Sequence, residues 1–99
     1  MSPPVPPASA GPIRLTLTET VEADELAALL TAARAAVDGR RGVTFDCSAA
    51  PFLPTGAVQL LFAAGRACRA RGLPFSAAGV QPPAAAYLRL AGLGAALGL

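Results

Sequence analysis

VTFDCSAAPFLPTGAVQLLFAAGRACRARG, residues 43–72, is the stretch that decides the fold. Its first residues, 43–47, are mostly apolar, which predicts a central strand with both faces covered. A loop containing Pro51 and Pro54 follows, and a helix is expected from Thr55 to residue 71, with Gly72 at its end. In α/β sheets, ligands and partners tend to meet the carboxyl ends of strands, so this junction is the first place to look for a site.

The flanking sequence repeats the same strand and helix pattern on both sides of this stretch. Alternating apolar residues predict a strand at 13–17, and apolar residues at helical spacing predict a helix at 23–37 that ends at Gly39. A short strand is expected at 74–79 and a third helix at 82–91, with two prolines in its first turn. Alternating strands and helices joined by short connections predict an α/β domain with a small, mostly parallel or mixed sheet flanked by helices.

The chain length allows one domain. Residues 1–11 contain four prolines, and their apolar residues show neither helical nor strand spacing. We therefore expect a disordered proline-rich tail there and a single domain over 12–99. The apolar C-terminal segment 93–99 is expected to fold back over the sheet.

The charge pattern argues against binding to nucleic acid. The chain carries eight basic residues, all arginine, against six acidic ones, a net charge of +2, and the arginines are scattered along the sequence. Nucleic-acid binding needs a concentrated basic face.

The remaining composition argues against a cofactor, a metal or a membrane span. There is no histidine, and Cys47 and Cys68 have no metal-ligand spacing, so both are expected to be small buried apolar residues in a reducing compartment. The longest uncharged apolar stretch, 47–65, is interrupted by prolines, and the N-terminus lacks a signal-peptide pattern. We therefore expect a cytoplasmic protein.

The hydroxyl of Thr55 has two possible roles. Pro54 favours an extended residue before the helix, so Thr55 can be the N-cap that accepts a hydrogen bond from a backbone N–H. The alternative is phosphorylation, because the N–H groups and dipole at a helix start stabilise negative charge. The sequence leaves both roles open.

Helical spacing predicts that one face of this helix looks outward. Four residues spaced by four, three and four positions share that face: Thr55, Gln59, Phe62 and Arg66. A more uniformly apolar side is formed by Val58, Leu61, Gly65 and Cys68. The outward face is a candidate docking surface, although Phe62 packing at the core edge and Arg66 at the solvated helix end are alternatives.

No catalytic constellation is evident. Without histidine or lysine there is no ordinary general base beside Thr55 or Ser48, and Asp46 is the only nearby acid. Asp46 is expected to anchor the loop, and the protein is expected not to be an enzyme.

Residues 13–99 resemble the STAS domain family, which includes anti-sigma-factor antagonists. The likeness rests on VTFDCSAAPFLPTGAVQLLFAAGRACRARG, similar to that family's strand, loop, junction and helix, and on AAYLRLAGLGAALGL, similar to its closing helix. The resemblance implies a non-enzymatic module without a cofactor. Its implied partner is an anti-sigma or chemosensory kinase, or an ATPase, often with a phosphorylation switch at the junction.

The junction departs from the antagonists in an informative way. Pro54 stands where an Asp is usual, Gly56 stands where antagonists carry their phosphorylated Ser, and Thr55 matches the preceding hydroxyl position. This pattern is closer to the small STAS subunit of phospholipid-transport ABC complexes and to STAS proteins of bacterial chemosensory kinases. Thr55 is the candidate phosphorylation site, and the candidate partner-binding residues are Ser48, Pro54, Thr55, Gly56, Gln59, Phe62 and Arg66.

Overall fold

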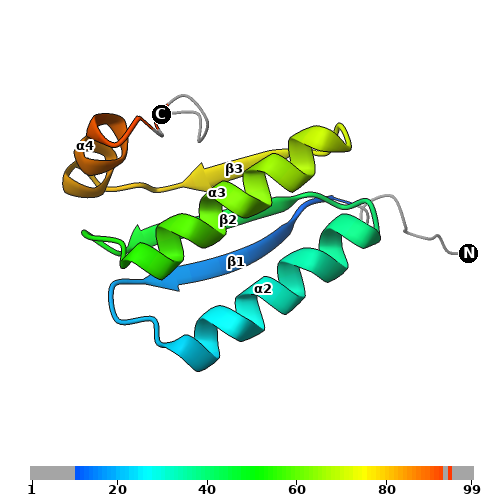
Figure 1. Cartoon of the computed structure of the whole chain (residues 1–99), viewed down its shortest axis with the longest axis horizontal. Helices are drawn as coiled ribbons and strands as arrows, with labels where there is room; N and C mark the ends of the chain where they lie inside the picture. Colours follow the sequence, from blue (N-terminus) through cyan, green and yellow to red (C-terminus); the bar gives the residue numbers. More distant parts are fainter. Residues whose placement is uncertain (1–10, 93, 95–99) are drawn as a thin grey trace, which may run out of the picture.

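The computed structural model describes residues 11–92 and 94 (Figure 1). Three strands alternate with three helices: β1 (Ile13–Thr18), α2 (Ala23–Asp38), β2 (Val43–Ala49), α3 (Thr55–Ala70), β3 (Phe75–Ala78) and α4 (Pro82–Leu90). The predicted α/β class is confirmed. The expected tail lies, apart from Gly11, outside the described residues, as does nearly all of the segment expected to fold back over the sheet.

The sheet is fully parallel in the order β1-β2-β3, with β2 in the centre. Ile13 and Phe75 are the register partners of Val43, so the three strands begin level with one another. Figure 1 shows α2 and α3 side by side over one face of the sheet, while α4 lies beyond the end of β3. The β2–α3 junction therefore lies at the carboxyl edge of the sheet.

The core fills the space between this sheet face and the two covering helices. Its largest fully buried side chains are Phe45, Leu17, Leu61, Leu88, Val43, Cys47 and Cys68. The rings of Phe45 and Phe75 meet edge to face, with centroids 6.3 Å apart. Leu88 brings α4 into the same cluster.

The opposite face of the sheet is polar. Thr44 hydrogen-bonds Ser76 through their hydroxyls at 3.1 Å, and Arg14 Nη2 lies 3.3 Å from Asp46 Oδ2. No helix of residues 11–92 lies over this face (Figure 1), so the expectation of two covered faces for β2 is wrong for the described chain. The reason is the period of two, which turns Thr44 and Asp46 away from the side that buries Phe45.

Local capping explains where the helices begin and end. Glu22 and Glu25 form a capping box at the start of α2, in which Glu22 N–H donates to Glu25 Oε1 at 3.0 Å. That helix ends at Gly39, as predicted. After α3, Gly72 adopts a φ of 67° and Leu73 N–H donates to Cys68 O at 2.8 Å, which confirms the expected glycine stop.

Candidate functional site

Thr55 is the first residue of α3 and not its cap. Pro54 is the N-cap, with φ −60° and ψ 155°, and its carbonyl accepts the first helical bond from Val58 N–H at 3.1 Å. No side-chain cap bond is made there, so the predicted capping role of Thr55 is wrong. The fixed φ of proline holds Pro54 in an extended conformation, and helical geometry begins at Thr55, one residue earlier than capping by Thr55 requires.

The first turn of α3 keeps unused hydrogen-bond donors. Because the first helical bond starts at Val58, the N–H groups of Thr55, Gly56 and Ala57 have no acceptor within the helix. The Thr55 side chain is exposed and the first turn contains no acidic residue. An anion on the Thr55 hydroxyl would therefore sit beside free donors, with no carboxylate of that turn to repel it.

The outward face of α3 has the predicted geometry. Thr55, Gln59 and Arg66 are exposed and Phe62 is half-buried, while the predicted apolar side, represented by Leu61 and Cys68 at 0% exposure, is in the core. We call these four outward residues the docking face.

Phe62 takes no part in the described core. It is absent from the hydrophobic cluster and from the half-buried apolar residues packed against that cluster. Its ring instead lies under Arg66, whose guanidinium carbon is 5.8 Å from the ring centroid. The core-edge alternative for Phe62 is therefore unsupported, although a binding role for it stays a prediction.

Gly56 lies where the start of α3 meets α2. A Cβ built on Gly56 would come within 2.6 Å of Leu26 Cδ1, so a side chain here would displace the end of Leu26. Sequence reasoning missed Leu26. The available signal was the glycine itself, since glycine in a helix often marks a close approach.

Ser48 is fixed by hydrogen bonds at the carboxyl edge of the sheet. Its Oγ donates to Asp46 Oδ1 at 2.7 Å, its N–H donates to the same oxygen at 3.0 Å, and Gln81 Nε2 donates to its carbonyl at 2.6 Å. Ser48 thus ties β2 to the segment before α4. Asp46 bonds to Ser48, two residues further along the same strand, and to Arg14 of β1, so its predicted role as a loop anchor is not confirmed. The hydrogen bonds from Ser48, followed by those from Arg14, lower its pKa.

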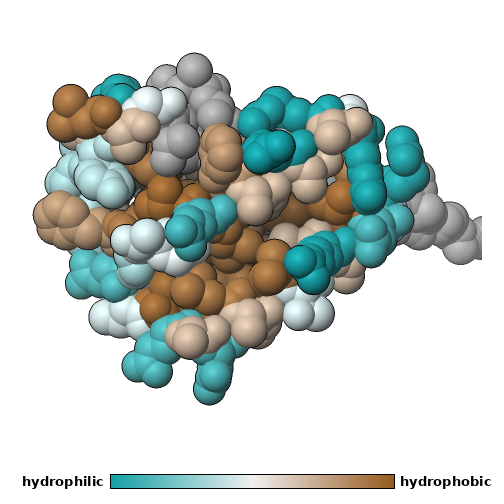
Figure 2. All heavy atoms as spheres, viewed as in Figure 1, coloured by the Kyte–Doolittle hydropathy of each residue, from teal (hydrophilic) through white to brown (hydrophobic). Residues whose placement is uncertain are grey.

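A groove that the sequence analysis did not predict runs between α2 and α3. It consists of two adjoining hollows of about 500 and about 310 Å³ that share Leu30, Leu60 and Ala63. Figure 2 shows the corresponding band of apolar side chains, crossed by hydrophilic ones. We call this the interhelix groove.

Few of the predicted site residues belong to the interhelix groove. Gly56 and Gln59 line the smaller hollow, whereas Thr55, Phe62 and Arg66 line neither. A signal for it was present in the outward alanines of α3, at 63, 67 and 70, because small side chains leave space beside a neighbouring helix.

The two cysteines are buried thiols, as predicted. Desolvation, followed by the charge of Asp46, raises the pKa of Cys47 to about 11, and desolvation also raises the pKa of Cys68. Neither is a ready nucleophile. Among residues 11–92 and 94 no cluster of three metal-ligating side chains occurs, and no helix is long and apolar enough to cross a membrane.

Comparison with known proteins identifies one family. Residues 7–99 match the sequence model described as Mlab, STAS domain. No curated protein and no solved structure matches the chain. STAS domains are in general regulatory and interaction modules, a class that needs a presented surface and no catalytic group. Since the match spans nearly the whole sequence, and the single α/β domain described above agrees with it, the chain belongs to the STAS domain family.

Proposed function

We propose that this STAS domain is a non-enzymatic regulatory module that docks a kinase-like protein through the docking face, in anti-sigma-factor-antagonist or chemosensory circuitry. The observation that carries the proposal is Phe62, a half-buried outward aromatic residue that does not pack against the described core. It is flanked on the same helix face by exposed Gln59 and Arg66. An aromatic anchor within a polar surround is the usual make-up of an interface hot spot.

Phosphorylation of Thr55 is the proposed switch. The exposed hydroxyl has no capping bond, and the free N–H groups of the first turn can receive a phosphate without unfolding the helix. The added charge would stand one helical turn from Gln59, at the end of the docking face. Docking of the partner would then depend on the charge at Thr55.

A second candidate function is a constitutive accessory subunit that binds the ATPase of a phospholipid-transport ABC complex. The observation that favours it is Gly56, which carries no hydroxyl and whose side-chain space is filled by Leu26. The chain thus lacks an acceptor at the position where antagonists carry one. Under this alternative the docking face is the same, but Thr55 contacts the ATPase unmodified.

Affinity purification with point variants tests both functions. Phe62→Ala is expected to reduce recovery of the partner about tenfold or more, the size of effect that defines a hot spot. Thr16→Ala, an exposed change on the polar sheet face, should leave recovery unchanged. Thermal unfolding of each variant checks that the fold is retained.

The Thr55 variants separate switching from constitutive binding. A switch requires Thr55→Ala and Thr55→Glu to differ in partner recovery and requires phosphate on Thr55 in the purified chain. Equal recovery by both variants, with an ATPase in constant ratio and no phosphate, supports the accessory subunit. If Phe62→Ala recovered the partner as well as the wild-type chain does, the docking face would be excluded as the binding surface in both candidate functions.

A further inference from the structure

We infer that the interhelix groove binds an amphipathic α-helix of the partner protein, oriented antiparallel to α2 and α3. This partner helix would have an apolar stripe, acidic residues in its first turn and basic residues in its last turn. The inference rests on the proposed function, because the smaller hollow adjoins the docking face through Gln59. It names the structural element that the partner would present.

The dimensions of the groove suit a helix. It extends along α2 from Leu26 to Asp38 and along α3 from Gly56 to Arg71, a span of about 20 Å or four helical turns at 1.5 Å per residue. Its α3 wall is mostly alanine, at 63, 64, 67 and 70, and small residues let a third helix approach closely. Leu30, which is 37% exposed, would be covered by the bound helix.

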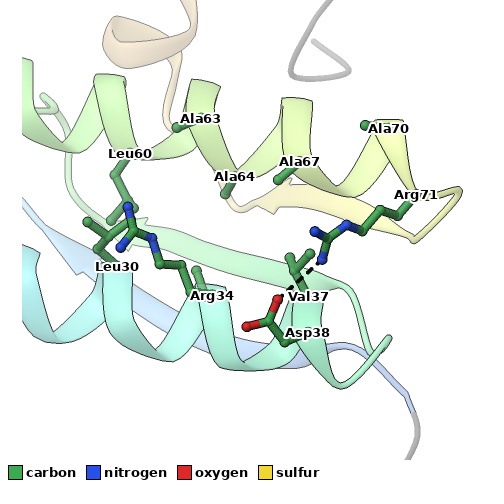
Figure 3. Close-up of a pocket in the computed structure, with 11 residues that line it drawn as sticks. Leu30, Arg34, Val37, Asp38, Leu60, Ala63, Ala64, Ala67, Ala70 and Arg71 are labelled. Atoms are coloured by element: carbon green, nitrogen blue, oxygen red, sulfur yellow. Dashed lines mark hydrogen bonds and ion pairs between the residues drawn. The ribbon is translucent and has the colours of Figure 1, made fainter.

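The carboxyl end of the groove is basic. Arg34 and Arg71 line the larger hollow, and Arg71 Nη1 is 3.3 Å from Asp38 Oδ1. Figure 3 shows this ion pair spanning the groove at one end, with the guanidinium of Arg34 extending from α2 towards Leu60. No described side chain forms an ion pair with Arg34. It is therefore placed to receive a carboxylate from the occupant.

The start of α2, beyond the amino end of the groove, is acidic. Glu22, Asp24 and Glu25 are exposed at the start of α2, and the first turn of α3 contains no basic residue. None of the three acids lines the smaller hollow, but an occupant helix that extends past Leu26 would run towards them with its last turn, which favours basic residues there. Arg34 in the larger hollow, unpaired among the described residues, and the acids beyond the smaller hollow thus favour the same direction for the occupant.

The helix dipoles favour the same direction. α2 and α3 follow parallel strands and run the same way along the sheet (Figure 1), so their positive amino ends lie together. An antiparallel third helix would place its negative carboxyl end beside them. Acidic first turns and basic last turns also stabilise the occupant helix itself.

A second copy of this chain fits less well. In the described part of the chain, α2 has acids in its first turn but no basic residue in its last turn, and α3 and α4 have no acid in their first turns. None of these helices has the charge pattern that the groove specifies. A helix from a different protein is therefore the expected occupant.

Synthetic peptides test the inference on the full chain. The probe is a fluorescent amphipathic peptide of about 18 residues, long enough for five turns, with leucines on one face, Glu in its first turn and Lys in its last. A peptide of the same composition with the Glu and Lys positions exchanged is the control. Fluorescence anisotropy should give at least about tenfold tighter binding for the first peptide, a difference expected from reversing close charge pairs.

Three variants locate the bound peptide. Ala63→Glu, which fills the shared part of both hollows, is expected to weaken binding about tenfold or more, whereas Ala35→Glu, exposed on α2 outside the groove, should not. Phe62→Ala should leave peptide binding unchanged, since Phe62 does not line the groove. Failure of the docking face and failure of the groove are thereby distinguished.

The inference is overturned by any of three results: no binding of the complementary peptide, equal binding of both peptides, or binding that Ala63→Glu does not weaken. Sedimentation equilibrium tests whether a second copy of this chain occupies the groove instead. A dimer of the wild-type chain that Ala63→Glu dissociates would show that a second copy fills the groove, and would also overturn the inference.

Discussion

Gly42 and Gly72 both have left-handed backbones, with φ of 76° and 67°, but only Gly42 lies against another segment. A Cβ on Gly42 would collide with the backbone carbonyl of Pro74, which accepts a hydrogen bond from Val43 N–H at 3.1 Å. A Cβ on Gly72 would meet nothing within 4 Å. Gly42 is thus needed for the strands to begin level with one another.

We predict that Gly42→Ala destabilises the fold more than Gly72→Ala. Left-handed geometry alone costs a non-glycine residue about 1–2 kcal/mol, so Gly72→Ala should lose about that amount. Gly42→Ala must also displace backbone and should lose more than about 3 kcal/mol. Urea denaturation measures both free energies of unfolding. Equal losses would show that the approach of Pro74 is unimportant.

Asp46 should make stability depend on acid pH. Hydrogen bonds from the Ser48 hydroxyl and N–H lower its folded pKa, with a smaller effect of Arg14, so the folded state favours the ionised carboxylate. This stabilisation is present above the unfolded pKa of about 3.9 and is lost as pH falls through the lower folded pKa. Asp46→Asn should therefore flatten the decline in unfolding free energy below about pH 4. An unchanged decline in the variant would contradict this account of Asp46.

The buried thiols should be protected in the native state. Because burial raises the pKa of Cys47 to about 11 and that of Cys68 above its usual range, neither should react with iodoacetamide at pH 8. Both should react once urea unfolds the chain. Mass spectrometry before and after unfolding measures this, and rapid native alkylation at either cysteine would show that the core opens locally.

At single residues, the sequence predicted the structural role correctly only where the chemistry of the side chain allows one main role. The two cysteines were correctly interpreted, because a cysteine in an apolar segment without metal-ligand spacing has few other roles. The cap at Thr55 was wrong, because helical geometry begins one residue after Pro54, a one-residue difference that sequence patterns do not resolve.

At the scale of elements, three sides of α3 have three different surroundings. One side, including Leu61, enters the core, another forms the docking face, and Ala63 with Ala67 borders the interhelix groove. Helical periodicity predicted the first two sides and the helix bounds. The alanines of α3 indicated space beside this helix, but the groove also depends on how far apart α2 and α3 lie, which no period within one helix encodes.

Substitutions on α3 should reflect this division. Leu61→Ala, at 0% exposure, should lower the free energy of unfolding by about 2–5 kcal/mol. Ala63→Ser, at an exposed position, should change it by about 0.5 kcal/mol or less. Denaturant unfolding of both variants measures the contrast, and similar losses would mean that the core is assigned to the wrong face of α3.

The whole molecule presents two different surfaces. One side of the sheet carries helices, an apolar groove and the docking face, and the other is a polar face with Arg14, Asp46 and hydroxyl side chains. The α/β fold class was predictable, because segments with strand-like spacing of apolar residues alternate along the chain with segments of helical spacing. The polar face was not foreseen, because the apolar character of residues 43–47 outweighed the alternation that places Thr44 and Asp46 on the far side.

The central claim is that a partner protein binds on the helical side, at the docking face. Photo-crosslinking in the cells that produce the chain tests it most directly, with benzoylphenylalanine placed at position 62 in one variant and at exposed position 16 of the polar face in another. The account predicts a crosslinked adduct with one partner from position 62 and none from position 16. An adduct from position 16 with none from position 62 would contradict it.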